Sequence, residues 1–185
     1  MRTEIILAGK GGQGILLAGY LIGYSVAKFT NYQVSSTEEY GAETRGTDSK
    51  MDIVIADEEI DFIGAERADI AIFMFKDQAA KYAKYVKDGA TVIIDSTLVN
   101  ADSLPRSWRV MGLPFTELAE KNLGTPRVAN MVMLGAFSSL GLVPINALEN
   151  AVKEVVNPRW IDLNIKALHL GLEEGKKLAA TQAAH

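Results

Sequence analysis

The sequence predicts an α/β protein with a Rossmann-like, mostly parallel sheet flanked by helices and a helical C-terminal part. Short apolar runs typical of buried strands alternate with helical segments over about residues 1–112, and only helical segments follow, over about 113–180. A glycine-rich segment separates the first strand from the first helix, as in Rossmann-like folds. The length of 185 residues suits one domain, so we expect a single domain over 1–185.

The expected strands are β-branched or apolar runs that end at glycine, charged or turn residues. The run at 68–75 is apolar almost throughout, as a strand covered on both faces of a sheet would be. The segment 38–47 is polar and contains glycines, so we expect a loop of about ten residues, longer than most connections. The predicted strands cover residues 3–8, 32–37, 50–56, 68–75, 90–95 and 108–111.

The expected helices are separated by proline, glycine or aspartate residues. Asp77 is a candidate N-cap, and Asp88 with Gly89 ends the helical segment that follows it. The longest apolar stretch, 128–143, is shorter than the ~20 residues that a membrane-spanning helix needs, so we expect a buried helix. The predicted helices cover residues 15–29, 77–85, 114–122, 126–143, 145–156 and 161–180.

The composition excludes several kinds of chemistry. The chain has no cysteine, which rules out disulfides, thiolate nucleophiles and cysteine-held zinc or iron–sulfur sites within it. It has two histidines, so we assign no metal ligand. The net charge of −4 lacks the basic excess that nucleic-acid binding requires. The first apolar run is too short for a secretory signal, so we expect a cytoplasmic protein.

The best candidate for a binding site lies between the first predicted strand and the first predicted helix. Its spacing, Gly-x-Gly-x-x-Gly, is that of the dinucleotide-binding fingerprint. Glycines permit positive φ angles and close approach of an anion, and the free N–H groups at a helix start attract phosphate. The alternative is that these glycines only let strand and helix pack tightly. We call the segment the glycine loop; it consists of Gly9, Lys10, Gly11, Gly12, Gln13 and Gly14.

A stand-alone oxidoreductase that binds NAD or FAD is one interpretation of the glycine loop. It requires an acidic residue at the end of the second strand, and Glu38 and Glu39 are candidates, although slightly far along the chain. The sequence has no recognisable catalytic half for such a dehydrogenase. His169 falls within a predicted helix and His185 is the last residue, so neither is a good candidate for proton transfer.

A second candidate segment, residues 39–47, combines two glycines, two acids, an aromatic and an arginine; we call it the second loop. In a doubly wound fold it would emerge beside the glycine loop, at the sheet edge where such folds bind ligands. Arg45 either clamps a phosphate or carboxylate or pairs internally with Glu39 or Glu43. Both interpretations remain open. The candidate binding residues here are Glu39, Tyr40 and Arg45.

Together, the two loops resemble the gamma subunit, or gamma domain, of the 2-oxoacid:ferredoxin (acceptor) oxidoreductases. The resemblance rests on the glycine loop, on Glu-Tyr-Gly-Ala-Glu-Thr-Arg-Gly at 39–46, on Asn-Met-Val-Met-Leu-Gly at 130–135 and on residues 164–171. It covers nearly the whole chain. One departure is Thr47, where the family often has a further glycine.

The resemblance implies a multi-subunit enzyme that oxidatively decarboxylates a 2-oxoacid to an acyl-CoA and passes the electrons to ferredoxin. It implies thiamine diphosphate and iron–sulfur clusters on the partners, which are alpha and beta (thiamine-binding) subunits and a ferredoxin-like delta subunit. This chain would then contribute to coenzyme A binding and assembly, through the glycine loop, Glu39, Tyr40 and Arg45, with no catalytic residue of its own. The implied 2-oxoacid is 2-oxoglutarate, and the isolated chain is expected to be inactive. A purely structural assembly module remains an alternative.

Overall fold

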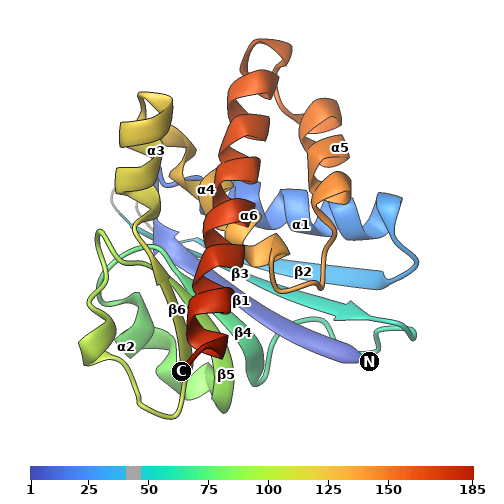
Figure 1. The fold of residues 1–185 in the computed structure, drawn as a ribbon. Coiled ribbons are helices and arrows are strands. Elements are labelled where there is room, and N and C mark those ends of the chain that lie inside the picture. Colours follow the sequence, from blue (N-terminus) through green and yellow to red (C-terminus); the bar gives the residue numbers. More distant parts are fainter. Residues whose placement is uncertain (41–46) are drawn as a thin grey trace.

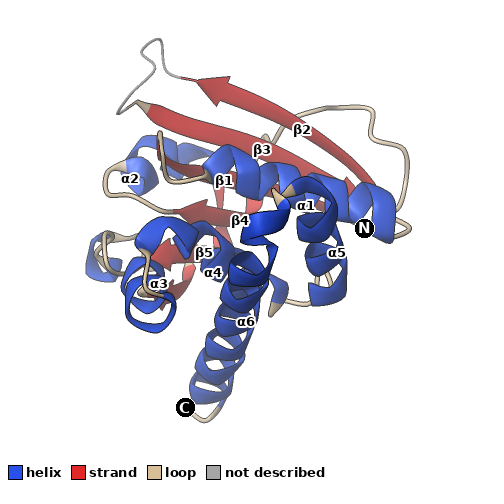
Figure 2. Ribbon diagram, turned by 90° about the horizontal axis from the view of Figure 1, so that it is seen from above, coloured by secondary structure: helices blue, strands red, loops and turns tan. Residues whose placement is uncertain are grey.

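The structure is a computed structural model that describes residues 1–40 and 47–185, with the side chain of Tyr40 outside the description. Residues 41–46 also lie outside it, and with them the predicted site residue Arg45. Figure 1 shows a sheet with most of its helices on one side, and Figure 2 shows the same arrangement from above.

One six-stranded sheet in the order β2-β3-β1-β4-β5-β6 forms the centre of the molecule. β1 pairs in parallel with β4, β4 with β5, and β5 with β6, whereas β3 is antiparallel to both of its neighbours, β1 and β2. The prediction of a mostly parallel sheet is therefore confirmed. The strands are β1 (Arg2–Lys10), β2 (Gln33–Tyr40), β3 (Asp48–Ala56), β4 (Ala68–Phe73), β5 (Val86–Asp95) and β6 (Arg109–Leu113).

Helices cover the two faces of the sheet unequally. The larger core joins Ile5, Leu7 and Ile53 of the sheet to apolar side chains of α1, α4, α5 and α6, and the smaller one joins Ala8 and Phe73 to α2. The predicted helical C-terminal part is present. The helices are α1 (Ile15–Phe29), α2 (Gln78–Tyr82), α3 (Phe115–Leu123), α4 (Ala129–Ser138), α5 (Ile145–Val155) and α6 (Ile161–Ala183), with 3-10 turns η1 (Ala83–Tyr85), η2 (Ala101–Ser103), η3 (Pro126–Val128) and η4 (Pro158–Trp160).

The two helices α4 and α6 cross at very short range because each has a glycine at the contact. A Cβ atom added to Gly135 would lie 2.0 Å from the carbonyl oxygen of Leu168, and one added to Gly171 would lie 1.7 Å from that of Val132. Every residue of α4 is buried. This crossing fixes the position of the start of α4, which lies beside the glycine loop.

Several element boundaries differ from the predicted ones. β2 runs on to Tyr40 instead of ending at residue 37, because residues 38–40 continue the ladder with β3. Asp88 and Gly89 do not end a helix but lie inside β5, where the Gly89 amide donates to Ser107 and its φ is +77°. The segment 77–85 is a short helix followed by a 3-10 turn, and α4 ends at Ser138.

Candidate functional site

The glycine loop lies at the edge of the sheet where the parallel strands β1, β4, β5 and β6 end, which we call the carboxyl edge. Lys10 at the end of β1 is paired with Asp48 at the start of β3, so the second loop reaches the sheet at the same edge. The amide of Gly11 donates a 2.8 Å hydrogen bond to the carbonyl oxygen of Thr47. As predicted, the end of the second loop therefore lies beside the glycine loop.

One half of the glycine loop is held in place by the side chain of Gln13. Its Oε1 accepts a 2.8 Å hydrogen bond from the Lys10 amide, and its Nε2 donates one of 2.9 Å to the carbonyl oxygen of Met74 beyond β4. A Cβ atom on Gly9 would lie 2.7 Å from the same Oε1. Gln13 therefore positions the loop, and both ends of its amide group are used within the protein.

The other half of the glycine loop presents unused amide groups. Gly12 and Gly14 have φ angles of +91° and +71°, and Gly14 is the N-cap of α1. Within residues 1–40 and 47–185, the amides of Gly12, Gly14, Ile15 and Leu16 donate no hydrogen bond. Unpaired amides at the positive end of a 15-residue helix form a favourable place for an anion.

A charged cluster connects the glycine loop to α2. The Asp48 carboxylate lies 2.9 Å from Lys10 Nζ and 2.6 Å from Lys81 Nζ, and it accepts a 2.8 Å hydrogen bond from Gln78 Nε2. The two ammonium groups, that of Lys81 above all, hold the pKa of the Asp48 carboxyl well below its usual range. Two lysines against one aspartate leave a net positive charge beside the loop. Sequence reasoning found Lys10 but missed Asp48, Gln78 and Lys81.

Glu39 lies away from the glycine loop. It is exposed on β2, with its Oε1 3.7 Å from Nζ of Lys50, and Lys50 is buried against Asp52 at 2.9 Å. The backbone of Tyr40 pairs with Ser49 at the end of the β2–β3 ladder. The structure therefore brings the backbone at position 40 to the carboxyl edge, but not the Glu39 side chain to the glycine loop.

The strand order also argues against the dinucleotide alternative. In that fingerprint the acid follows a strand adjacent to the first one, where it can reach a ribose. Here β3 lies between β1 and β2, and neighbouring strands are about 4.8 Å apart, so Glu38 and Glu39 are on a strand roughly 10 Å from β1.

Two other polar residues from the sequence have structural partners. Asp95, fully buried at the end of β5, accepts hydrogen bonds from the Thr97 amide at 3.1 Å and the Thr116 hydroxyl at 2.5 Å. It thus orders the turn after β5 and the start of α3. His169 lies on α6 and pairs with Glu149 of α5. These contacts stabilise the fold, and we assign neither residue to the site.

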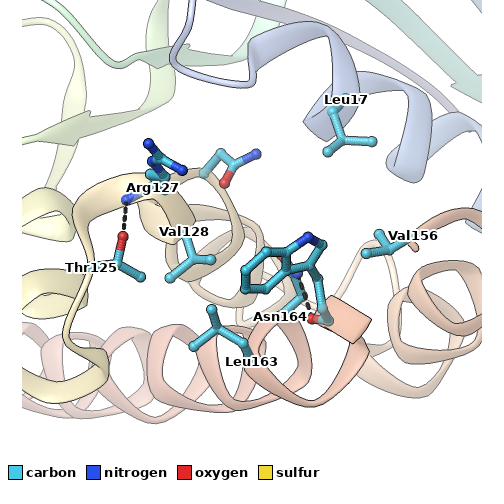
Figure 3. Close-up of a pocket in the computed structure, with 9 residues that line it drawn as sticks. Leu17, Thr125, Arg127, Val128, Val156, Leu163 and Asn164 are labelled. Atoms are coloured by element: carbon cyan, nitrogen blue, oxygen red, sulfur yellow. Dashed lines mark hydrogen bonds between the residues drawn. The ribbon is translucent and has the colours of Figure 1, made fainter. Parts of the chain in front are cut away.

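A pocket of about 440 Å³ opens beside the glycine loop, and sequence reasoning did not find it. It lies between the first turn of α1, the start of α4 and the start of α6; Figure 3 shows Leu17 of α1 across from Val128 and Leu163. Asn130, which lines the pocket and is 5% exposed, donates a hydrogen bond from Nδ2 to the carbonyl oxygen of Gly14 at 3.2 Å. The pocket and the loop are therefore in direct contact.

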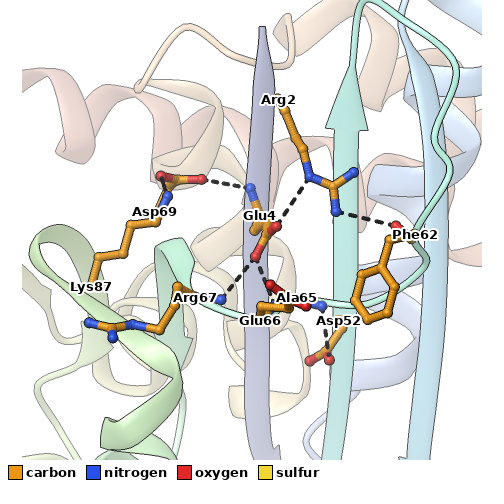
Figure 4. A network of polar contacts seen from close by, with 9 residues as sticks. All are labelled: Arg2, Glu4, Asp52, Phe62, Ala65, Glu66, Arg67, Asp69 and Lys87. Atoms are coloured by element: carbon orange, nitrogen blue, oxygen red, sulfur yellow. Dashed lines mark hydrogen bonds and ion pairs between the residues drawn. The ribbon is translucent and has the colours of Figure 1, made fainter.

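At the opposite edge of the sheet, a polar network surrounds the start of β1 (Figure 4). The Glu4 carboxylate accepts hydrogen bonds from the amides of Glu66 and Arg67 at 2.9 and 3.0 Å, and Asp69 accepts one from the Glu4 amide. These bonds fasten the segment between β3 and β4 to β1. Across residues 1–40 and 47–185 there is no group of His, Cys, Asp and Glu side chains suited to a metal ion, and none of the helices is long and apolar enough to cross a membrane.

Comparisons with known proteins agree with the resemblance seen in the sequence. Residues 4–174 match the model of the pyruvate ferredoxin/flavodoxin oxidoreductase family. The chain is 38% identical over 180 residues to the 2-oxoglutarate synthase subunit KorC of Methanocaldococcus jannaschii, covering 96% of each chain. It is 37% identical to the KorC subunit of Methanothermobacter marburgensis, covering 96% of this chain and all of that one.

Solved structures share the fold. The gamma subunit of a keto/oxoacid ferredoxin oxidoreductase from Geobacter sulfurreducens superposes with a TM-score of 0.82 at 30% identity, over 95% of this chain and 99% of that one. A 2-oxoglutarate:ferredoxin oxidoreductase from Magnetococcus marinus, with 2-oxoglutarate, coenzyme A and succinyl-CoA bound, has a TM-score of 0.84 at 22% identity. That likeness, which covers 97% of this chain and 31% of the longer one, shows the fold alone.

Proposed function

The chain belongs to the pyruvate ferredoxin/flavodoxin oxidoreductase family and is an oxidoreductase subunit, and from this premise we propose that it contributes the coenzyme A-binding loop of an enzyme that oxidises 2-oxoglutarate. The observation that carries the coenzyme A proposal is the open half of the glycine loop. Its amides, with Lys10 at the mouth of the loop, match the pyrophosphate of coenzyme A in charge and in hydrogen-bonding capacity.

The position of Lys10 supports this role. Its side chain is about one-third exposed, and its ammonium group is paired with Asp48, which also pairs with Lys81. A phosphate can therefore bind the Lys10 ammonium group while Asp48 keeps its ion pair with Lys81. The 2-oxoglutarate:ferredoxin oxidoreductase from Magnetococcus marinus, which is 22% identical to this chain, has coenzyme A bound. All of the predicted binding residues stay predictions, and among them Glu39 has the weakest support.

The choice of 2-oxoglutarate rests on the relatives. The KorC subunits of 2-oxoglutarate synthases are 34–38% identical to this chain over nearly its whole length. A ketoisovalerate oxidoreductase subunit is 31% identical and an indolepyruvate oxidoreductase subunit 26% identical. The steady fall in identity favours 2-oxoglutarate over a branched or aromatic 2-oxoacid.

The partners in this proposal carry the redox chemistry. Alpha and beta subunits would bind thiamine diphosphate, and a ferredoxin-like delta subunit would hold iron–sulfur clusters, since this chain has no cysteine to bind one. We assign no residue of this chain to bond breaking. We also propose that the complex is cytoplasmic, because coenzyme A serves there as the carrier of acyl groups.

The complex purified from native cells through a tag on this chain tests the proposal. We expect thiamine- and cluster-bearing subunits to co-purify, and we expect reduction of ferredoxin that requires both 2-oxoglutarate and coenzyme A. The isolated chain should bind coenzyme A, measured by calorimetry, and show no turnover. Absence of such partners, or a complex indifferent to coenzyme A, would refute the proposal.

A further inference from the structure

The pocket beside the glycine loop has the composition of a ligand site. Its walls are mainly apolar, and a few polar groups are placed among them, as in most small-molecule pockets of 300–1,000 Å³. Leu17, Val128, Val156 and Leu163 form the apolar walls, together with the indole of Trp160.

Trp160 provides a flat surface at the mouth of this pocket. The residue is 46% exposed, although a large aromatic side chain is normally covered in a folded chain. Asn164 Nδ2 donates a 2.7 Å hydrogen bond to its carbonyl oxygen, and the guanidinium carbon of Arg159 lies 4.7 Å from the centre of the indole ring. Trp160 is therefore held in position while part of its ring stays accessible to a planar ligand.

Arg127 adds a positive charge to the pocket. It lies on η3, where its amide donates to the Thr125 hydroxyl at 3.2 Å, which fixes the backbone (Figure 3). Its guanidinium forms neither a hydrogen bond nor an ion pair with any part of residues 1–40 and 47–185. A guanidinium group in this state is suited to bind a phosphate with two hydrogen bonds.

The pocket and the open amides of the glycine loop lie within one ligand's reach. Leu17 is in the first turn of α1, and one helical turn is about 5.4 Å long. Asn130 lines the pocket and contacts Gly14 directly. A ligand with a ring and two separate phosphate groups could therefore contact Trp160, Arg127 and the glycine loop together.

We propose that this pocket binds the nucleotide end of coenzyme A, with the adenine ring against Trp160 and the 3′-phosphate at the Arg127 guanidinium. The inference rests on the proposed function, because it takes the pyrophosphate to lie at the glycine loop. It adds a specificity that the loop alone cannot supply: coenzyme A differs from dephospho-coenzyme A only in the 3′-phosphate, so Arg127 distinguishes the two.

The test measures binding of three probes to the full chain: coenzyme A, dephospho-coenzyme A and pantetheine. The chain has two tryptophans, so Trp108→Phe leaves Trp160 as the only one, and its fluorescence reports on the pocket. We expect coenzyme A and dephospho-coenzyme A to change this fluorescence and pantetheine to leave it unchanged. If Trp108→Phe does not fold, calorimetry on the other variants gives the affinities.

Two substitutions separate the ring from the phosphate. Arg127→Gln should weaken coenzyme A binding by roughly tenfold, the size of a lost charge-assisted hydrogen bond, and leave dephospho-coenzyme A binding unchanged. Trp160→Leu should weaken the binding of coenzyme A and of dephospho-coenzyme A by roughly tenfold, because the adenine ring of each ligand loses the indole on which it stacks. Arg106→Gln, at an exposed residue between η2 and β6, removes the same charge elsewhere and should change neither affinity.

The results distinguish a failure of the pocket inference from a failure of the proposed function. If Gly14→Ala abolishes coenzyme A binding while Arg127→Gln and Trp160→Leu leave it intact, the pocket inference is wrong and the proposed function stands. If those two variants keep their affinity for coenzyme A but lose complex assembly, the pocket belongs to a partner subunit and the inference is again wrong. If the unaltered chain and the purified complex both fail to bind coenzyme A, the proposed function falls, and the inference with it.

Discussion

The glycines at the crossing of α4 and α6 and Gly12 of the glycine loop are required for different reasons. Gly135 and Gly171 have ordinary helical backbones, but backbone atoms of the facing helix leave no room for a Cβ atom. Gly12 has open space around it and a φ of +91°, which side chains rarely adopt. Gly135 and Gly171 allow the two helices to pack closely, whereas Gly12 allows a backbone conformation that leaves amide groups exposed. Substitutions should therefore separate stability from binding.

The largest effect is expected for Gly171→Ala. The new methyl group would lie 1.7 Å from the Val132 carbonyl oxygen, a backbone atom that can only move if the two helices separate. We expect a loss of about 3 kcal/mol in the free energy of unfolding, the upper range for an overpacked core, measured by urea denaturation.

Gly23→Ala is the matched control for Gly171→Ala. Gly23 also lies inside a helix, α1, but nothing lies within 4 Å of a Cβ atom placed there. This substitution should raise stability by about 0.5 kcal/mol, because alanine favours the helix. Equal effects of the two substitutions would contradict the packing role of Gly171.

Gly14→Ala should show both constraints at once. Its φ is +71°, and the new Cβ atom would lie 2.3 Å from Nδ2 of Asn130. We expect a loss of about 2 kcal/mol in the free energy of unfolding. In the double variant Gly14→Ala/Asn130→Ala the clash disappears, so the two losses should not add. Strict additivity would show that the Asn130 side chain does not crowd Gly14.

Gly12→Ala should affect binding more than folding. Only the backbone angle opposes the new methyl group, so we expect a cost of about 1 kcal/mol in stability. A changed loop should misplace the open amides and weaken coenzyme A binding, measured by calorimetry, while complex assembly, measured by size-exclusion chromatography, stays intact. Loss of assembly with normal coenzyme A affinity would favour the alternative in which the chain is a purely structural module.

The loop was predictable from the sequence because its signals are local. The apolar run before Gly9, the glycine spacing and the apolar helix after Gly14 lie next to one another in the chain. The order of the strands was not predictable in this way. That β3 enters the sheet between β1 and β2 depends on which strands pair, and the apolar patterns of these strands are compatible with several orders.

The parts of the site that the sequence did not reveal depend on distant residues. Asp48 pairs with Lys10 and Lys81, which lie 38 and 33 positions away in the chain, and no local sequence pattern predicts either contact. The pocket likewise joins Leu17 of α1 to Trp160, which only the helical packing brings together. The segment around Asn130 is part of the family resemblance, but its contact with Gly14 depends on packing across 116 positions of the chain.

The charge of Asp48 distinguishes the loop region from the uncharged helix crossing and should give the smallest effect. The ammonium groups of Lys81 and Lys10 lower the pKa of this carboxyl in the folded chain, while the unfolded pKa is about 4. The stabilisation is therefore complete above about pH 4 and is lost as the pH falls toward the folded pKa. Both pairs are partly exposed, so we expect about 1 kcal/mol at most. Asp48→Asn should be less stable than the unaltered chain at pH 6, and the difference should shrink toward pH 2 in urea denaturation; a difference that stays constant would mean that the carboxylate charge does not stabilise this region.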